Sequence, residues 1–289
     1  MYEVKILADS VSPSGIRLLT VQATFPRFIL AEVNTHRMLS RNSASSRAIP
    51  PEKLIDRVIH TPFVPETFNK RVKGMGVGEE LSAQEQSTAR AVWLAARDDV
   101  VACARELLEM DCDKSRINRL LEPFLWHTAI ITATEWDNFF ALRDHPAAQP
   151  EFQQLARMML EAMLKSAPAQ LDPGEWHLPL VFEADEQLVA DHDTLPGISA
   201  ARCARVSYNR QEDDESPEDS LTRAKHLARA GHLSPFEHPA YVPLTNAGQE
   251  EFHGNFKGWV QLRKEIPNEE NVIGAQEGID NWEERLDIP

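Results

Sequence analysis

The longest predicted helix limits most strongly how this chain can fold. Ser82 and Glu85 stand at the spacing of a capping box, in which each side chain bonds the backbone N–H of the other residue where a helix begins. The apolar residues that follow recur at helical spacing and form one stripe: Trp93, Ala96, Val100, Ala104, Leu107 and Leu108. We expect this stripe to pack in the core or against a second subunit, and we assign it no chemistry.

Shorter segments carry strand, helix or loop patterns. Residues 2–8 and 18–25 predict strands, and in the second strand Val21, Ala23 and Phe25 share one face. Helices are predicted over residues 26–35, 51–59, 114–121, 128–142, 151–165, 198–206 and 219–230. Loops are predicted over residues 38–50, 61–80, 167–197 and the acidic run 212–215, where polar residues, glycines or prolines dominate.

The balance of charge limits the classes of ligand. The chain has 30 basic and 45 acidic residues, which gives a net charge of −15 at pH 7. A protein that grips DNA or RNA through phosphates needs a basic face, so the sequence predicts no nucleic-acid partner. A small anionic substrate remains compatible, because a few arginines can form a local positive pocket in an acidic protein.

The apolar residues and the cysteines predict a cytoplasmic protein without a membrane span. The longest apolar stretch, residues 124–140, is interrupted by His127, Glu135 and Asp137. The N-terminal residues do not have the pattern of a signal peptide. The three cysteines are scattered and form no CxxC pair, which is typical of reduced thiols.

The densest group of chemically capable side chains spans Thr35 to Arg47. Three arginines and one histidine stand there among serine, asparagine and alanine residues. The fork of donors on an arginine fits phosphate oxygens, and small residues let backbone N–H groups approach a ligand. The segment could therefore hold a phosphate together with a polar heterocycle, although its composition alone fits a solvated polar loop equally well.

This segment resembles the signature of the flavin-dependent thymidylate synthase family, R-H-R-x2-S-x-N-x2-S-x-R. Six of the seven fixed positions match, namely His36, Arg37, Ser40, Asn42, Ser45 and Arg47. The first arginine of the pattern is replaced by Thr35.

Two further parts of the chain are similar to the same family. Residues 200–208 and 231–238 resemble its N-terminal region, where an A-A-R-V-S stretch leads to H-x-[ST]-P-F-E-H, and residues 114–154 resemble its C-terminal half. In most members the F-E-H piece precedes the signature, whereas here it follows by about 190 residues. The resemblance therefore suggests a divergent and circularly permuted member.

The resemblance implies one catalytic α/β domain of the α+β type over residues 1–289. It would consist of a mostly antiparallel sheet with packed helices and a long-helix bundle. Residues 1–166 would hold the signature and the helical half, residues 198–264 the permuted F-E-H half, and residues 265–289 a tail. The family also implies a homotetramer in which different subunits contribute to each active site.

The implied reaction is C5 methylation of dUMP to dTMP. In the family, 5,10-methylenetetrahydrofolate donates the one-carbon unit, reduced FAD supplies the hydride and NADPH reduces the flavin; no metal is implied. Two alternatives stay open. One is C5 hydroxymethylation, or methylation of another pyrimidine deoxynucleotide such as dCMP, on the same fold. The other is a non-catalytic relative that only binds nucleotides.

Family positions also imply the site residues. No cysteine lies in a motif suited to attack on the pyrimidine, so activation needs a fixed cation beside the ring. Arg143, at the end of a segment similar to N-F-L-x-L-R, falls on the arginine with that catalytic role. The implied substrate-binding residues are Glu32, Ser43, Ala44, Ser45, Ser46, Arg47, Arg119 and Arg143, and the implied cofactor-binding residues are Thr35, His36, Arg37, Asn42, Ser43, Asn138, Glu237 and His238. The simpler interpretations are that Arg143 caps a helix and that His238 is a paired core histidine.

Several positions depart from the family pattern. Thr35 removes a cation, and Glu32 stands where the family has glutamine, while Ser43 replaces a glutamate. Thr132 and Thr134 fall near an asparagine and an arginine that contact the flavin in the family. These changes could alter how the flavin diphosphate is held or which pyrimidine is accepted, since the Glu32 carboxylate could accept from a cytosine amino group.

Overall fold

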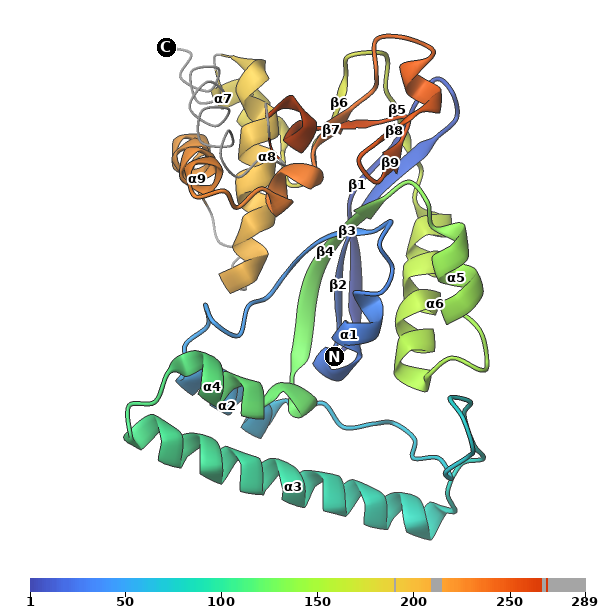
Figure 1. Cartoon of the computed structure of the whole chain (residues 1–289), viewed down its shortest axis with the longest axis vertical. Helices are drawn as coiled ribbons and strands as arrows, with labels where there is room; N and C mark the ends of the chain where they lie inside the picture. Colours follow the sequence, from blue (N-terminus) through green and yellow to red (C-terminus); the bar gives the residue numbers. More distant parts are fainter. Residues whose placement is uncertain (190, 209–214, 267–268, 270–289) are drawn as a thin grey trace.

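A five-stranded sheet forms the centre of the structure, a computed structural model that describes residues 1–189, 191–208, 215–266 and 269 (Figure 1). The spatial order is β3-β4-β2-β1-β5. The strands are β1 (Glu3–Val11), β2 (Arg17–Pro26), β3 (Ser40–Ser43), β4 (Trp126–Ala133) and β5 (Ala169–Gln170). Neighbouring strands are antiparallel except for the short parallel pair β1–β5, which confirms the predicted mostly antiparallel sheet.

One face of the sheet packs against two helices, α5 (Asp137–Arg143) and α6 (Pro150–Lys165). The alternation predicted for the second strand is confirmed, since Val21, Ala23 and Phe25 all belong to this buried cluster. The cluster includes Phe152 and Leu155 of α6, and burial of each such side chain contributes about 1.5–3 kcal/mol.

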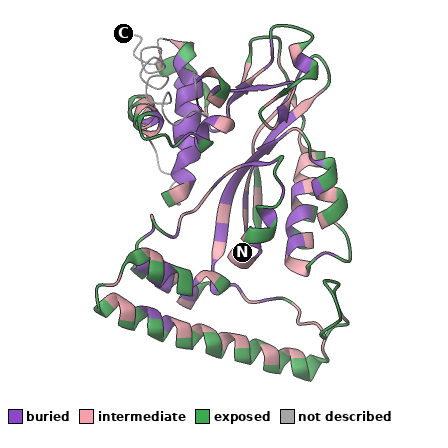
Figure 2. Cartoon of the chain, viewed as in Figure 1, coloured by how far each residue is buried: buried purple, intermediate pink, exposed green. Residues whose placement is uncertain are grey.

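The C-terminal half of the chain covers the opposite face (Figure 1). Leu18 packs there against Phe256 and Trp259, and Ile130 packs against Cys203 of α8. Figure 2 shows that buried residues concentrate in the central sheet and along α8. The elements of this half are β6 (Trp176–His177), α7 (Glu183–Leu188), α8 (Leu195–Ala204), α9 (Pro217–Arg229), β7 (Ala240–Tyr241), β8 (Phe252–His253), β9 (Phe256–Lys257) and β10 (Val260–Gln261).

A separate layer of helices lies at one end of the sheet (Figure 1). It consists of α2 (Pro51–His60), α3 (Ala83–Glu109) and α4 (Lys114–Leu120). The predicted capping box at Ser82 is confirmed. The predicted stripe packs against α2 and α4 with one exception, Ala96, which is exposed. Exposed residues follow the outer side of α3 along its length (Figure 2).

The remaining helical elements are short. A four-residue helix, α1 (Leu30–Val33), follows β2, so the helix predicted over 26–35 is broken into two turns. The 3₁₀ turns are Arg27–Ile29, Glu122–Phe124, His192–Thr194, Arg205–Tyr208, Ser234–Glu237, Gly248–Glu250 and Leu262–Glu265. Within the described residues, no helix is both long and apolar enough to cross a membrane.

Two predictions about the signature region and its neighbour were wrong. Residues 128–142 do not form one helix, because β4 ends at Ala133 and α5 begins at Asp137. The β-branched residues at 128 and 130–132 favour a strand, and the segment is buried between β2 and β3. Residues 38–50 are not wholly a loop, because Ser40–Ser43 forms the edge strand β3, with the small polar side chains of Ser40 and Asn42 buried.

Two loop predictions in the C-terminal half were also incomplete. The segment 167–197 contains β5, β6 and α7 and runs into α8. Glu215 was expected in a solvated loop, but its buried carboxylate pairs with Arg205 at 3.3 Å and with Arg223 at 2.5 Å. Residues 212–214, and all of the predicted tail except 265, 266 and 269, lie outside the described residues.

Candidate functional site

Two groups of signature residues lie at the two ends of β3. Residues 35–39 precede the strand, and residues 44–47 follow it. The four residues of β3 pair with β4 from Ser40 opposite Thr132 to Ser43 opposite Ala129. The signature segment therefore follows one edge of the sheet, and each of its ends meets a different part of the fold.

The first group lines a pocket of about 360 Å³, which we call the signature pocket. Its lining residues are Thr35, His36, Arg37, Met38, Leu39, Glu135, Asn138, Phe139, Leu142, Arg143 and Phe252. Five of them were selected from the sequence: Thr35, His36, Arg37, Asn138 and Arg143. Sequence reasoning missed Phe252, which β8 brings from the distant C-terminal half and which belongs to no motif.

The guanidinium of Arg143 is held in a fixed place at this pocket. Its Nε donates to His36 Nε2 at 2.8 Å, and its central carbon lies 4.5 Å from the centre of the Phe152 ring. Burial, with nearby arginines, lowers the pKa of His36 to about 4, so this ring is neutral at pH 7. Because a guanidinium only donates, His36 Nε2 accepts and the ring proton is on Nδ1. Arg143 thus does more than cap the end of α5.

The F-E-H piece contacts the signature segment across the edge of the sheet. His238 Nε2 lies 3.2 Å from Asn42 Oδ1, and His238 is fully buried. Glu237 accepts a hydrogen bond from the Ser40 hydroxyl at 2.7 Å and pairs with Arg263 at 2.6 Å. The structure therefore brings together the two segments that the sequence separates by about 190 residues.

The second group lies beside α4. The side-chain amide of Asn118 donates to the backbone oxygens of Ser46, at 2.7 Å, and of Ile49, at 2.9 Å. Arg119, the next residue, has a side chain that is 58% exposed. Arg47 is also exposed, so two cations selected from the sequence stand in solvent at this end of the signature segment. Neither of them lines the signature pocket.

Three residues that sequence reasoning missed support the second group. Arg27, Arg57 and His127 line a small cavity of about 20 Å³ together with Ala44, Ser45 and Ser46. Arg27 donates to the Ala44 oxygen at 3.2 Å and to His127 Nδ1 at 2.8 Å. No motif marks these residues, and His127 directly precedes the segment 128–142 that was wrongly predicted as a helix.

Four of the departures from the family pattern lie outside the signature pocket. Glu32 is exposed on α1, and Ser43 pairs with Ala129 in the sheet. Thr132 is fully buried and bonds His238, while the Thr134 hydroxyl accepts from the backbone N–H of Lys257 at 3.0 Å. Both threonines thus hold the C-terminal half against the sheet. Thr35 alone among the substituted positions lines the pocket.

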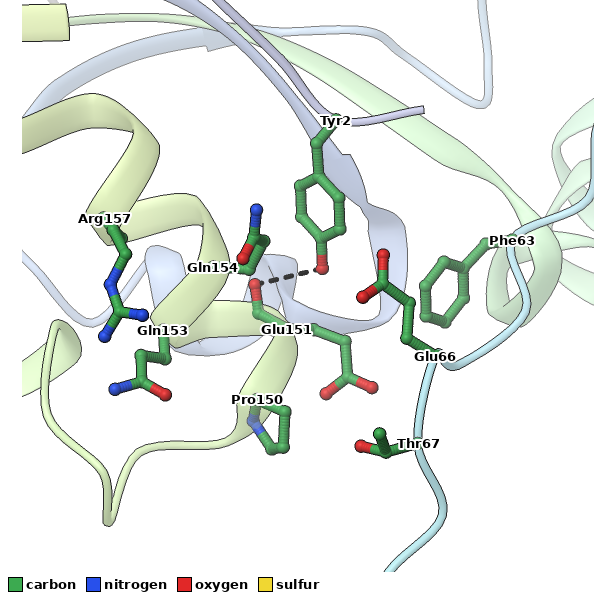
Figure 3. A pocket seen from close by; sticks show the side chains of 9 residues that line it. All are labelled: Tyr2, Phe63, Glu66, Thr67, Pro150, Glu151, Gln153, Gln154 and Arg157. Atoms are coloured by element: carbon green, nitrogen blue, oxygen red, sulfur yellow. Dashed lines mark hydrogen bonds between the residues drawn. The ribbon is translucent and has the colours of Figure 1, made fainter. Parts of the chain in front are cut away.

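Two of the other pockets, neither of which contains a residue selected from the sequence, lie near the N-terminus. The pocket in Figure 3, about 190 Å³, lies where Tyr2 donates to the Glu151 backbone oxygen, and the carboxylates of Glu66 and Glu151 approach it. A larger pocket of about 890 Å³ lies between the sheet and the helical layer and is lined by Arg57, among others. We assign no chemistry to either pocket.

Acid should destabilise the fold because four buried histidines are neutral in the folded state. Burial lowers the pKa of His127, His177 and His238 to about 3, and burial beside arginines lowers that of His36 to about 4. Unfolded histidines titrate near pH 6.5, so below that pH the unfolded state binds more protons. As the pH is lowered below about 6.5, the unfolding free energy should fall by up to about 1.4 kcal/mol per pH unit for each histidine.

Urea unfolding at pH 7, 6 and 5 measures this slope. The unfolding free energy should depend less steeply on pH in His127→Gln, which removes one buried histidine. The same dependence should not change in His60→Gln, because His60 is exposed. Equal slopes in the two variants would contradict the assignment of neutral buried histidines.

Two crystal structures are similar to this one at low sequence identity. They are those of the UMP/dUMP methylase PolB from Streptomyces cacaoi, bound with 5-Br UMP or with 5-Br dUMP. The identities are 14% and 15%, and the TM-scores are 0.46 and 0.47. Both alignments cover 57% of this chain, and they cover 89% and 90% of the PolB chains. Among curated proteins there is no significant match.

Residues 12–169 match the family described as "Thymidylate synthase complementing protein". The match spans more than half of the chain and includes the whole signature segment, Arg119 and Arg143. It ends before the F-E-H piece, which the structure nonetheless places against the signature. The chain therefore belongs to the thymidylate synthase complementing protein family, and it is an enzyme of the flavin-dependent thymidylate synthase type.

Proposed function

We propose that this enzyme methylates C5 of dUMP to give dTMP, with FAD, NADPH and 5,10-methylenetetrahydrofolate. The observation that carries the proposal is that two other family segments contact the signature segment. Arg143 bonds His36 of the signature, and His238 of the F-E-H piece bonds Asn42 of the same signature. These contacts support a site built from segments that are far apart in the sequence.

The signature pocket suits the planar ring of a flavin. Its volume of about 360 Å³ is within the usual range for cofactor sites. Phe139, Leu142 and Phe252 offer apolar surface, while Arg37 and Asn138 offer donors. Reduced FAD would supply the hydride of the reaction when it is bound there.

The charge at this pocket sets how a diphosphate could be held. Thr35 replaces the arginine of the family pattern, and Glu135 adds a carboxylate to the lining. Arg143 is already engaged with His36 through its Nε. Arg37, which is exposed, is therefore the residue that would pair with the flavin diphosphate.

Arg143 would act on the pyrimidine as a fixed cation. The bond to His36 uses Nε, so Nη1 and Nη2 can donate to a ring oxygen where negative charge develops. The neutral His36 ring and the Phe152 ring hold the guanidinium in place without cancelling its charge. Such a preorganised donor stabilises an ionised pyrimidine, and it requires no cysteine nucleophile.

The nucleotide phosphate would be bound by the other end of the signature segment. Ser45, Arg47 and Arg119 lie there, beyond β3 and apart from the signature pocket of the same chain. We propose that a homotetramer joins the Ser45 end of one subunit to the Arg143 end of another. This arrangement would complete the substrate site.

No observation favours dCMP as the substrate. The carboxylate that could recognise a cytosine amino group belongs to Glu32, which is exposed and does not line the signature pocket. Methylation of dCMP and C5 hydroxymethylation are therefore kept as outcomes of the assay.

The direct test is an assay of the purified protein with FAD, NADPH and 5,10-methylenetetrahydrofolate. dUMP and dCMP are offered separately, and the products are identified by mass spectrometry. We expect a yellow protein that forms dTMP from dUMP. A hydroxymethylated product, or reaction with dCMP alone, would replace the proposed substrate or product. A protein that neither binds FAD nor forms any product would contradict the proposal.

Arg143→Ala should lower turnover by a factor on the order of 100–1,000, because one preorganised donor at the developing charge is lost. Arg157→Ala is the matched control, since Arg157 is an exposed arginine on α6 that pairs with Asp144. Steady-state rates and melting temperatures are measured for both variants. If Arg143→Ala retains full turnover, Arg143 is not the activating cation.

Mixing two inactive variants should restore activity if subunits share the site. Arg119→Ala would disable the phosphate end, and Arg143→Ala would disable the ring end. After the two are denatured together and refolded, mixed oligomers contain some sites with both arginines intact. Activity above that of either variant supports a shared site. No recovery, with refolded wild-type enzyme active, would show that each chain builds its own site.

A further inference from the structure

Six buried polar side chains form a continuous chain of hydrogen bonds behind the sheet. Four of them come from neighbouring strands, one from each of β1, β2, β4 and β3, and two histidines connect them. The sequence of contacts is Ser10 Oγ to His177 Nδ1 at 2.8 Å, His177 Nε2 to Thr20 Oγ1 at 2.8 Å, Thr20 Oγ1 to Thr132 Oγ1 at 2.7 Å, Thr132 Oγ1 to His238 Nδ1 at 2.8 Å, and His238 Nε2 to Asn42 Oδ1 at 3.2 Å. We call these six residues the polar chain.

The polar chain is buried, and apolar side chains pack on the same face of the sheet. Thr20, Thr132 and His238 are 0% exposed, and the other three side chains are at most 8% exposed. Leu18, Ile130 and the residues that cover them lie on the same face of the sheet. A buried polar group without a partner costs about 1–3 kcal/mol, so each of these contacts is strongly favoured in the folded protein.

The contact at the signature segment shows in which direction the hydrogen bonds run. Asn42 Oδ1 only accepts, so His238 Nε2 must carry a proton and donate to it. Burial keeps the His238 ring neutral, and its Nδ1 therefore accepts from the Thr132 hydroxyl. The single proton of Thr132 is then committed, so Thr132 must accept from Thr20.

The same logic continues to the far end. The proton of Thr20 is committed to Thr132, so Thr20 accepts from His177 Nε2. His177 is neutral as well, and its Nδ1 accepts from the Ser10 hydroxyl. All five bonds thus run in one direction. Reversing any one of them would require reversing the others and turning the amide of Asn42.

We propose that Ser10, His177 and Thr20 are positioning residues, which act through Thr132 to hold His238 in its Nε2–H form and thereby set the orientation of the Asn42 amide. The proposal rests on the proposed function and on the cofactor-binding role that the resemblance implies for Asn42, whose buried side chain in β3 does not itself line the signature pocket. With Oδ1 facing His238, the Nδ2 group points away from that histidine. The polar chain would therefore fix the Asn42 side chain within the signature segment, and its effect on a bound flavin would reach the pocket through residues 35–39.

This role does not follow from the family match. His177 and His238 both lie beyond residue 169, where the match ends. Ser10 precedes its start at residue 12. The C-terminal half thus supplies both rings that link the strands, and the polar chain is one way in which that half can act on the signature.

The strands contain a matched control for the central contact. Thr20 and Thr132 are directly opposite each other in β2 and β4, and so are Thr24 and Thr128, whose hydroxyls lie 3.0 Å apart. Thr24 and Thr128 are not members of the polar chain and do not line the signature pocket. Replacing Thr20 or Thr24 by valine removes one hydroxyl from the same pair of strands at nearly constant side-chain volume.

The first measurement is the tautomer of His238, read from its ring ¹⁵N shifts in the protein without FAD. We expect the Nε2–H form in the wild type, in Thr24→Val and in Thr20→Ser, which keeps the hydroxyl at position 20. In Thr20→Val we expect a mixture of tautomers, because Thr132 is no longer forced to donate to His238. Ser10→Ala, which removes only the outermost hydroxyl, should change the mixture in the same direction and serves if Thr20→Val does not fold.

The second measurement is the dissociation constant of FAD for the same variants. It should rise about tenfold in Thr20→Val, which corresponds to one misdirected hydrogen bond, and by less than about twofold in Thr24→Val and Thr20→Ser. An unchanged His238 tautomer in Thr20→Val overturns the proposal, and so does a changed tautomer with unchanged FAD binding. If the wild type does not bind FAD at all, the proposed function fails, whereas the tautomer comparison still decides whether the polar chain controls His238.

Discussion

The hydrogen bond between His238 and Asn42 is the contact on which the site depends. It joins the C-terminal half of the chain to the signature segment, and the bond from Ser40 to Glu237 reinforces the same junction. Both contacts are largely shielded from water, where a hydrogen bond is electrostatically stronger and an unmade one is more costly. The order of these segments along the chain therefore matters less than their contact in space.

The edge strand β3 determines how the signature can work. Because it is short and paired with β4, it separates the residues before it from the residues after it. The residues proposed to bind the ring lie near Arg143, and those proposed to bind the phosphate lie near Arg119. On the proposed function, a single chain presents two half-sites. An enzyme of net charge −15 would thereby still offer local cations to an anionic nucleotide.

Motif spacing and the family resemblance predicted which residues of the candidate site lie together. They did not predict the strands and buried hydrogen bonds that hold these residues in place. His36, Arg37 and Arg143 line one pocket, as expected from the family segments to which they belong. Residues 128–133 of strand β4 were predicted as part of a helix, because a short apolar run is compatible with both helical and strand periodicity. The bond of Thr20 to His177 joins residues 157 positions apart, and only the register of the sheet reveals such a partner.

A crystal structure of the enzyme with FAD and dUMP would test the central claim most directly, since it locates both ligands relative to the signature. The account predicts the isoalloxazine in the signature pocket against His36 and Arg37. It predicts the nucleotide phosphate at Ser45 and Arg119 of one subunit and the pyrimidine beside Arg143 of another. A flavin or a nucleotide bound away from residues 35–47 would contradict it.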